Sequence, residues 1–465
     1  MHQLAAAFHK KQSELFSPSG RFPELYQFLN PWVGCTINGK IHLLFKKRVL
    51  PIEGEPVTNH EHMNRIPKGF IAEPYPYHHE LELLISDITN LGVGIGRDGD
   101  WVIQVPFCWP GEKVRVRIFR NHSNYSQADL VEVITPSSDR IEPVCKLHGT
   151  CGGCQYQGAR YESQLLWKRQ QVENSLVRLG KVSVPVSPVV PSPKPFGYRS
   201  KLTPHYQGGR QGDDLTIGFL RNGSRRALVD VSHCPIATDA INDALPGARE
   251  DLRQAPKRKK GGTLLLRDVL EGVVTDPKQL VSEKVGELIF HFKAGEFFQN
   301  NPYILPQLVE YVVSQANAEE NNLLVDAYCG GGLFGLSAAS RFQQVVGIEI
   351  SREGFEGART NAQINRIKNA QFFLGEASSI FQEVNEFSGS SALIIDPPRR
   401  GCDPDFLKQA IAFSPSTIVY VSCEPATQAR DAQALLEAGY RAISAQPFDL
   451  FPQTRHVENV LTLVR

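Results

Sequence analysis

Leu323-Leu-Val-Asp-Ala-Tyr-Cys-Gly-Gly-Gly-Leu-Phe-Gly335 is the stretch that decides the expected fold of this 465-residue chain. Its apolar opening predicts a buried strand, and the glycines from Gly330 onward predict a tight turn that opens a helix. A second predicted strand, Val345–Glu349, places a carboxylate 23 positions after Asp326. A carboxylate at that strand end can bind both hydroxyls of a ribose. The carboxyl-terminal part of the chain therefore predicts an open α/β sheet with a nucleotide-like ligand.

The fourth predicted strand of this part, which follows a third at Ala392–Asp396, ends at a cysteine. Ile418-Val-Tyr-Val421 is apolar and mostly β-branched, and Pro425 cannot continue a sheet ladder. Cys423 should therefore lie at the carboxyl end of the strand. Because ligands of open α/β sheets bind in the crevice beyond those ends, we predict that Cys423 is a nucleophile. A buried, inert cysteine is the alternative for Ser-Cys taken alone.

The composition is typical of a soluble globular protein with two or three domains. Hydrophobic residues make up 41% of the chain, charged residues 21%, and the formal net charge is +1. The sequence contains no apolar run near the roughly 18 residues of a membrane span and no secretory signal, so we expect a cytoplasmic protein without a membrane partner. The near-zero net charge neither demands nor excludes nucleic acid, because a local basic face decides that question. Nothing in the sequence requires more than a monomer.

Residues 78–140 predict a small β-barrel. Four or five short stretches alternate apolar and polar residues and are separated by turn signals such as Pro110-Gly111. Arg115, Arg117 and Arg120 alternate with valine, isoleucine and phenylalanine, so phosphates could bind on their shared face. A merely solvated strand face is the alternative. Residues 1–77 show no long period, and we assign them no role.

A glycine-rich loop carries three cysteines at a spacing typical of metal or cluster ligands. They are Cys145, Cys151 and Cys154. A fourth ligand must come from elsewhere, and we predict Cys234, with His148 and His233 as alternatives. Spacing alone does not separate zinc from a 4Fe-4S cluster, but four thiolates favour the cluster over zinc. Buried free thiols are the remaining alternative.

Further basic elements follow in residues 141–290, which predict a central β-rich α+β domain. A helical period covers residues 161–179, and a proline-rich connector then leads to Tyr198, Arg199 and Lys201. Such residues can stack on a base and contact phosphates. The basic loop Lys257–Gly261 interrupts the strands beyond. Together with the barrel arginines, these residues favour an RNA or DNA partner over simple solvated charge.

Four motifs make the chain from about residue 78 to 465 resemble the RNA uracil-5-methyltransferases, a family that acts on 23S rRNA and on the T loop of tRNA. The motifs are Phe297-Phe-Gln299-Asn-Asn301, Asp326-Ala-Tyr-Cys-Gly-Gly-Gly332 with Glu349, Asp396-Pro-Pro-Arg399, and Ser422-Cys423-x-Pro425 followed by His456-Val-Glu458. The four cysteines resemble the 4Fe-4S site of the branch that modifies rRNA. Residues 78–140 resemble a TRAM domain, an OB-like barrel that binds RNA.

This resemblance implies the domain organisation. After an extension of unknown role (1–77) come a TRAM barrel (78–140), a central domain with the cluster and RNA-binding elements (141–290), and a Rossmann-like, S-adenosylmethionine-dependent catalytic domain (291–465).

The resemblance also implies the reaction, which is S-adenosylmethionine-dependent methylation of carbon 5 of a uridine, in 23S rRNA in preference to tRNA. Cys423 would add to carbon 6 of the uracil, and Glu458 would remove the hydrogen from carbon 5. The implied cofactor-binding residues are Gln299, Tyr328, Gly330, Gly332, Glu349 and Asp396. The target base would be flipped out of its stack, and the cluster would be structural or would position RNA.

Two residues depart from the family pattern. Glu424 stands where asparagine is usual, and its carboxylate should disfavour a Cys423 thiolate unless it points away. Leu333 replaces an asparagine of the glycine turn.

Two other classes of protein fit the motifs less well. A nicotinamide-dependent iron-sulfur oxidoreductase leaves Asp396-Pro-Pro-Arg399 without a role, and a non-catalytic RNA-binding module has no use for Cys423 paired with Glu458.

Overall fold

The structure is a computed structural model, and it describes residues 66–255, 257–317, 322–384 and 390–465. The predicted extension, residues 1–77, therefore lies mostly outside the described residues. Among the described residues, no helix is both long and apolar enough to cross a membrane.

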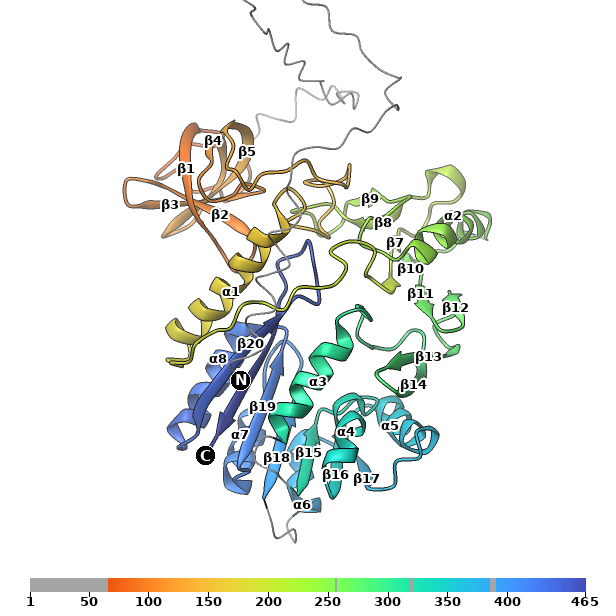
Figure 1. Cartoon of the computed structure of the whole chain (residues 1–465). Helices are drawn as coiled ribbons and strands as arrows, with labels where there is room; N and C mark the ends of the chain where they lie inside the picture. The colour runs from red at the N-terminus through yellow and green to blue at the C-terminus, as the bar shows by residue number, and fades with distance from the viewer. Residues whose placement is uncertain (1–65, 256, 318–321, 385–389) are drawn as a thin grey trace, which may run out of the picture. The chain divides into compact units, whose positions relative to one another are not determined.

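A closed barrel opens the described part of the chain (Figure 1). Its strands pair in the order β1-β2-β3-β5-β4. Buried and exposed residues alternate along them, so that Val114, Val116 and Ile118 of β4 all point into the core. Closure leaves the sheet without a free edge, and it confirms the predicted barrel. The strands are β1 (Glu80–Ile88), β2 (Val93–Asp98), β3 (Trp101–Pro106), β4 (Lys113–Asn121) and β5 (Tyr125–Thr135).

The barrel arginines predicted as a phosphate face bind carboxylates of the same barrel. Arg117 donates two hydrogen bonds to Glu80, at 2.7 and 2.9 Å. Arg115 lies 2.9 Å from Glu132 and 3.4 Å from Glu82. These ion pairs connect neighbouring strands across the sheet. Arg115 and Arg117 therefore fit the alternative of a solvated strand face better than that of a phosphate-binding face.

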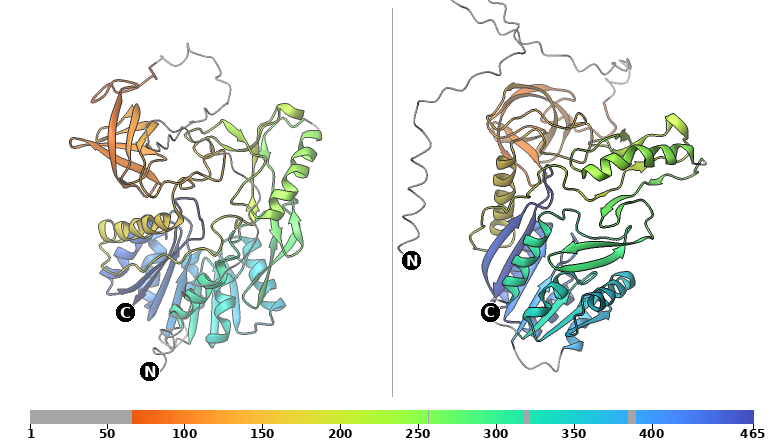
Figure 2. Two further views of the ribbon diagram at one scale, coloured as in Figure 1. Left: turned by 45° about the horizontal axis from the view of Figure 1, so that its top comes forward. Right: turned by 45° about the vertical axis from the view of Figure 1, so that its right-hand side comes forward.

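The central part begins with α1 (Tyr161–Arg178), where the helical period predicted a helix. Small sheets follow, in the orders β10-β7-β8-β9, β12-β11-β6 and β13-β14. The elements are β6 (Lys201–Leu202), β7 (His205–Tyr206), β8 (Ile217–Leu220), β9 (Leu228–Asp230), α2 (Asp239–Gln254), β10 (Gly262–Thr263), β11 (Leu266–Val269), β12 (Gly272–Val274), β13 (Leu280–Val285) and β14 (Leu288–Lys293). The helix α2 packs on β11 and β12, as Figure 2 shows from two sides.

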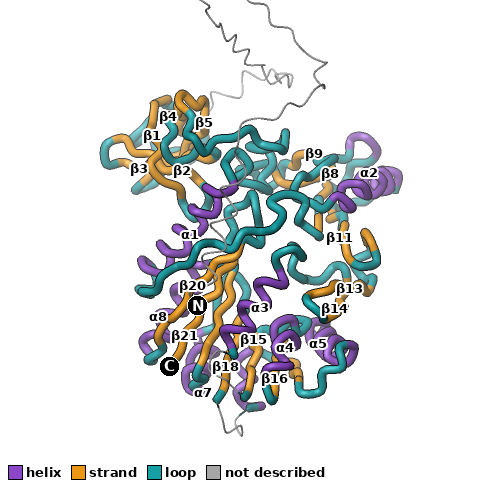
Figure 3. The backbone as a smooth tube through the Cα atoms, in the orientation of Figure 1, coloured by secondary structure: helices purple, strands orange, loops and turns teal. Residues whose placement is uncertain are grey.

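The last part is the expected α/β sheet, with the order β17-β16-β15-β18-β19-β21-β20 (Figure 3). The first five of these strands run parallel, and β21 runs antiparallel to both of its neighbours. The strands are β15 (Leu323–Ala327), β16 (Gln344–Glu349), β17 (Ala370–Leu374), β18 (Ser391–Ile395), β19 (Thr417–Ser422), β20 (Arg441–Phe448) and β21 (Glu458–Val464).

Both faces of this sheet are covered, which explains why its strands are apolar throughout. Leu324 points into one core and Leu323 into the other, because side chains alternate along a strand. One core includes α3 (Leu305–Ala316), α4 (Leu333–Ala338) and α5 (Arg352–Ile364). The other includes α1, α6 (Ile380–Glu383), α7 (Pro404–Phe413) and α8 (Pro425–Glu437).

A buried ion pair ties α1 to the loop that follows β20. The Lys168 ammonium lies 2.6 Å from the Asp449 carboxylate, and both side chains are fully buried. The same ammonium donates to the carbonyl of Phe451 at 3.1 Å. Removing one partner of such a pair leaves an uncompensated buried charge. The pair therefore holds the segment that leads into β21 against α1.

The strand directions bring Glu458 beside Cys423. Cys423 directly follows β19, and Glu458 is the first residue of β21. Because β21 runs antiparallel to β19, with Ser422 opposite Asn459, the start of β21 lies next to the end of β19. The strand order also reverses beside β15, which is where open α/β sheets bind their ligands.

Candidate active site

One cavity of about 1160 Å³ receives most of the residues predicted from the sequence. Of the predicted catalytic and cofactor-binding residues, those that line it are Cys423, Glu458, Gln299, Tyr328, Gly330, Glu349 and Asp396. The four predicted cluster cysteines line the same cavity. Gly332 does not line it. Its φ of 87° instead lets the chain turn into α4, a left-handed conformation that glycine adopts without strain.

The glycine turn is held by the carboxylate of Glu349. One oxygen of this carboxylate accepts the N–H of Gly330 at 2.9 Å, and the other accepts the N–H of Ser351 at 2.8 Å. Tyr328 adopts a φ of 65°, which is unusual for a residue other than glycine, and its ring lines the cavity. Strained residues of this kind gather at functional sites. The carboxylate of Glu349 keeps lone pairs free for ribose hydroxyls.

Asp326 supports this turn from beneath. One of its oxygens accepts the N–H of Gly335 at 2.8 Å, and the other is buried without a partner among the described residues. Burial, together with the nearby carboxylates of Asp396 and Glu349, raises the pKa of Asp326 to about 7. Asp326 is therefore a structural group of the turn, because it does not line the cavity.

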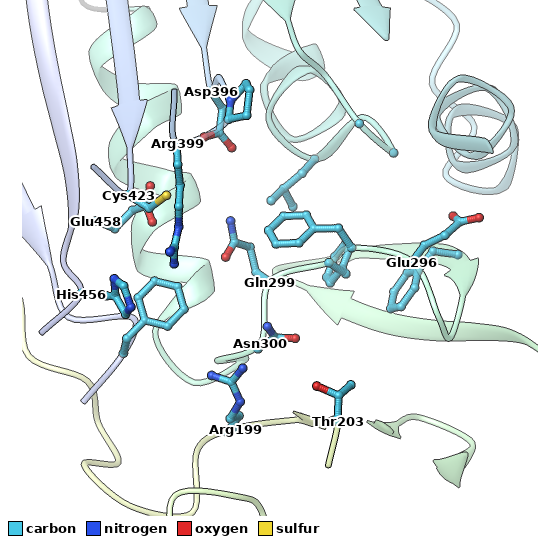
Figure 4. Close-up of a pocket in the computed structure, with 18 of the residues that line it drawn as sticks. Arg199, Thr203, Glu296, Gln299, Asn300, Asp396, Arg399, Cys423, His456 and Glu458 are labelled. Carbon is cyan, nitrogen blue, oxygen red and sulfur yellow. The ribbon is translucent and has the colours of Figure 1, made fainter. Parts of the chain in front are cut away.

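The thiol of Cys423 lies between two carboxyl groups and one guanidinium (Figure 4). Burial raises the pKa of Cys423 to about 12, and the carboxylates of Glu458 and Asp396 contribute to this rise. The Arg399 guanidinium acts in the opposite direction, through its charge and a hydrogen bond to the thiol. The resting side chain is thus a protonated thiol. Glu424 is not among the charges that shift the Cys423 pKa, although Glu424 and Cys423 both line a second, small pocket.

Glu458 and Asp396 influence each other strongly. Burial raises the pKa of Glu458 well above its usual range, and the Asp396 carboxylate raises it further. Burial also raises the pKa of Asp396. Two like charges this close cannot both ionise easily, so the pair retains a proton over a wide pH range. Such a pair can hold and exchange a proton beside a reacting thiol.

The loop that carries Arg399 is fastened to α8, and sequence reasoning did not single out this contact. The Asp431 carboxylate accepts the N–H of Cys402 and the hydroxyl of Tyr420, both at 2.7 Å. Gly401 has a φ of 82°, and a Cβ there would lie 2.5 Å from the Asp431 carboxylate. In the sequence, the Pro397-Pro398 pair indicates that this loop is restricted. The contact with Asp431 leaves no local signal in the sequence, because Asp431 lies on α8.

The Thr427 hydroxyl also joins the two reactive loops. It lies 3.1 Å from the carbonyl oxygen of Arg399 and 3.0 Å from that of Glu424. The first carbonyl belongs to the Arg399 loop and the second to the residue after Cys423. Thr427 therefore fixes the spacing between the guanidinium and the thiol.

His456 is a further cavity residue, noted in the sequence only as part of a motif. Burial, together with the positive charge of Arg399, lowers its pKa to about 3. Its imidazole is therefore neutral near pH 7. Figure 4 shows it beside Arg399 and below Cys423 and Glu458, with Arg199 and Asn300 lower in the cavity. A neutral imidazole here can donate or accept a hydrogen bond to a polar base.

The four predicted cluster cysteines meet at another wall of the cavity. Burial raises the pKa of Cys154 to about 12, and Cys234, Cys151 and Cys145 contribute to this rise, so these three thiols lie within electrostatic reach of Cys154. Within the described ranges, however, no three metal-ligating side chains converge closely enough to hold a single metal ion. The described structure therefore shows neither a zinc site nor a cluster site at these cysteines.

Comparison with known proteins covers nearly the whole chain. The family model described as tRNA (Uracil-5-)-methyltransferase matches residues 273–465, and the TRAM domain model matches residues 79–131. The tRNA (uracil(54)-C(5))-methyltransferase of Schizosaccharomyces pombe is 39% identical over 92% of this chain and 87% of its own length. The enzyme of the same name from Saccharomyces cerevisiae is 32% identical, over 84% of this chain and 74% of its own.

This chain belongs to the tRNA (uracil-5-)-methyltransferase family. A crystal structure of the Pyrococcus abyssi tRNA (uracil-54, C5)-methyltransferase, in complex with S-adenosyl-L-homocysteine, agrees with this assignment. It is 26% identical, has a TM-score of 0.62, and covers 83% of this chain and 100% of that chain. The chain is therefore an RNA (uracil-5-)-methyltransferase that uses S-adenosylmethionine, and residues 79–131 form its TRAM domain.

The reactivity of Cys423 in this methyltransferase tests the electrostatics of the site. Arg399→Gln removes the cation that favours the thiolate, so Cys423 should react more slowly with iodoacetamide at pH 8 to 9. Glu458→Gln removes a negative charge, which lowers the Cys423 pKa and should make alkylation faster. Each pKa unit changes the thiolate fraction about tenfold below the pKa. The alkylated peptide is quantified by mass spectrometry. Rates that change in the same direction in both variants would contradict these electrostatics.

Proposed function

We propose that this protein methylates carbon 5 of a uridine in tRNA. The relatives from two yeasts and the archaeal structure, all named for uracil 54 of tRNA, support this target. They do not support the preference for 23S rRNA expected from the sequence. That preference depended only on the four cysteines, and a cysteine set does not identify an RNA. We further propose that the domains divide at residues 78, 141 and 291.

The convergence of Cys423, Glu458, Asp396 and Arg399 on one cavity is the observation that carries the proposed chemistry. Carbon 5 of uracil is a weak nucleophile. When the Cys423 sulfur adds to carbon 6, a sulfur–carbon bond forms, and the electron pair of the C5=C6 double bond makes carbon 5 nucleophilic. Because the thiol is protonated at rest, its proton must pass to solvent water during this addition. Arg399 favours the thiolate as it forms.

Glu458 completes the reaction in this proposal. After carbon 5 has been methylated, Glu458 takes its hydrogen as a proton. The electrons of that C–H bond restore the C5=C6 double bond, and the sulfur–carbon bond breaks to release the Cys423 thiolate. One proton is released overall, because a methyl group has replaced a hydrogen. The raised pKa values of Glu458 and Asp396 make the carboxylate that is ionised in this pair a stronger base, which can accept this proton at a buried position.

The described residues fit S-adenosylmethionine. Glu349 would bind the ribose hydroxyls, and Tyr328, Gly330 and Gln299 would contact the rest of the molecule, with Asp396 between it and Glu458. Gly332 would act indirectly, by shaping the turn. S-adenosylmethionine supplies a methyl group on a positively charged sulfur, which carbon 5 can attack. The cavity also admits a base, so the target uridine would leave its stack to reach Cys423.

We also propose that Cys145, Cys151, Cys154 and Cys234 hold a 4Fe-4S cluster. A single zinc ion requires sulfurs about 4 Å apart, whereas a cluster of several irons holds its thiolates farther apart. The observation that supports this proposal is that the other three thiols lie within electrostatic reach of Cys154, at the wall of one cavity. The reaction has no redox step, so the cluster would fasten the loop of Cys145–Cys154 to the segment of Cys234.

Release of tritium tests the reaction and its target together. Uridine labelled with tritium at carbon 5 should lose its label to water when tRNA is incubated with S-adenosylmethionine and enzyme. We expect release from tRNA and not from 23S rRNA. Cys423→Ala should reduce release at least about a thousandfold, since no nucleophile remains, while S-adenosylmethionine binding persists. Release from 23S rRNA alone would reverse the proposed target. Full activity of Cys423→Ala would refute the proposed nucleophile.

Glu458→Gln tests the base. With the proton on carbon 5 left in place, the sulfur–carbon bond cannot break by elimination, so the RNA should accumulate as a covalent adduct. The adduct is measured as a species of reduced mobility on a denaturing gel, and it should exceed the wild-type level about tenfold or more. Cys423→Ala combined with Glu458→Gln is the control and should form none. Equal amounts of adduct in wild type and Glu458→Gln would assign the base elsewhere.

The metal content of the purified protein tests the cluster. We expect iron and acid-labile sulfide in equal amounts, with a visible absorbance that Cys234→Ser largely removes. Cys402→Ser is the matched control, because Cys402 is also buried but bonds to Tyr420 and lies outside the set. This control should keep its iron. Zinc in place of iron, or equal iron loss in both variants, would exclude the proposed cluster.

A further inference from the structure

Three loops at one end of the molecule carry a concentration of positive charge. They are residues 207–214, 221–227 and 257–261, and they adjoin the sheet β10-β7-β8-β9. We call their cations the basic rim. They are Arg210, Arg221, Arg225, Arg226, Lys257, Arg258, Lys259 and Lys260. All eight are exposed, and the only carboxylates in the same loops are Asp213 and Asp214.

Hydrogen bonds hold the three loops together, so the rim is one surface. The Gln207 side chain donates to the carbonyl of Arg226 at 2.9 Å. The backbone N–H of Gly209 donates to the carbonyl of Arg258, also at 2.9 Å. Arg258 itself donates to the hydroxyl of Tyr206 at 2.6 Å. The charges therefore cannot simply move apart to relieve their repulsion.

The rim cations lack the partners that other surface cations of this protein have. None of the ion pairs found among the described residues involves any of the eight. Arg115 and Arg117 of the barrel, by contrast, each bind a carboxylate. A group of like charges without counter-charges repels itself and attracts a polyanion. The rim, and not the barrel arginine face, has this property.

The rim adjoins the catalytic cavity without being part of it. None of the eight cations lines the cavity, but His205 of β7 and Phe219 of β8 do. Arg221 pairs by its backbone with Cys151, another residue of the cavity wall. A chain that leaves the cavity over His205 or Phe219 would therefore come to the rim next.

We propose that the basic rim binds phosphates of the tRNA where its chain leaves the cavity beside the uridine that enters it. This inference depends on the proposed function. Eight charges spread over three loops suit a polyanion with regularly spaced phosphates better than a single small anion. Contacts of this kind position a nucleic acid without reading its bases. They release bound counterions, so they weaken steeply as salt rises.

The test compares two variants that each lose four positive charges. The rim variant carries Arg225→Gln, Arg226→Gln, Lys259→Gln and Lys260→Gln. The control carries Lys113→Gln, Arg115→Gln, Arg117→Gln and Arg341→Gln, which replace cations that are paired with carboxylates. The dissociation constant of an unmodified tRNA transcript is measured over a range of KCl concentrations. S-adenosylmethionine binding checks folding, because none of these residues lines the cavity.

Each lost phosphate contact lowers the slope of log K against log salt by about 0.7 to 0.9. The rim variant should therefore lose about 3 units of slope and bind about tenfold or more weakly near physiological salt. The control should lose less than about one unit. Equal losses in the two variants would overturn the proposal, because net charge alone would then explain them. A rim variant with the wild-type slope would overturn it as well. Wild-type enzyme that methylates no tRNA would instead refute the proposed function.

Discussion

Two buried carboxyl groups beside one thiol are the constraint on which the rest of this structure depends. Asp396 and Glu458 oppose ionisation of each other and of Cys423, and burial increases every one of these effects. Arg399 is the cation that offsets them at the thiol. A small displacement of its guanidinium would leave Cys423 facing negative charge alone. The chain therefore needs a rigid support for the Arg399 loop, and the buried carboxylate of Asp431 provides it.

The sheet supplies the same rigidity to the other members of the site. Asp396 and Cys423 directly follow neighbouring parallel strands, and Glu458 begins the antiparallel strand beyond them. Three segments distant in the sequence thus meet at one edge through backbone pairing alone. The buried pair of Lys168 with Asp449 then fixes the segment that enters β21. The positions of Asp396, Cys423 and Glu458 are therefore set mainly by the register of their strands, and side-chain contacts then hold them there.

Sequence reasoning found the features that have a local signal. The period of residues 161–179 gave a helix, and the apolar runs ending at Asp326 and Cys423 gave buried strands. Features that depend on distant partners were missed, such as the contact of Asp431 with the Arg399 loop. The barrel arginines were taken for a phosphate face because Glu80 and Glu82 lie on another strand. Gly332, predicted to bind the cofactor, does not line the cavity, and its positive φ allows the turn into α4.

The residues that select the RNA must lie outside the edge of the sheet that carries Asp396, Cys423 and Glu458. In the proposed reaction Cys423 and Glu458 act on carbons 6 and 5 of the uracil ring, and every uridine presents the same two atoms. The cavity can thus select a base but not a position in an RNA. Position must be read from the shape of the surrounding chain, through phosphates that are held at fixed places. Cations that already bind carboxylates contribute little to this, whereas unpaired cations beside the cavity contribute strongly. The basic rim is therefore where this protein has the means to distinguish one folded RNA from another.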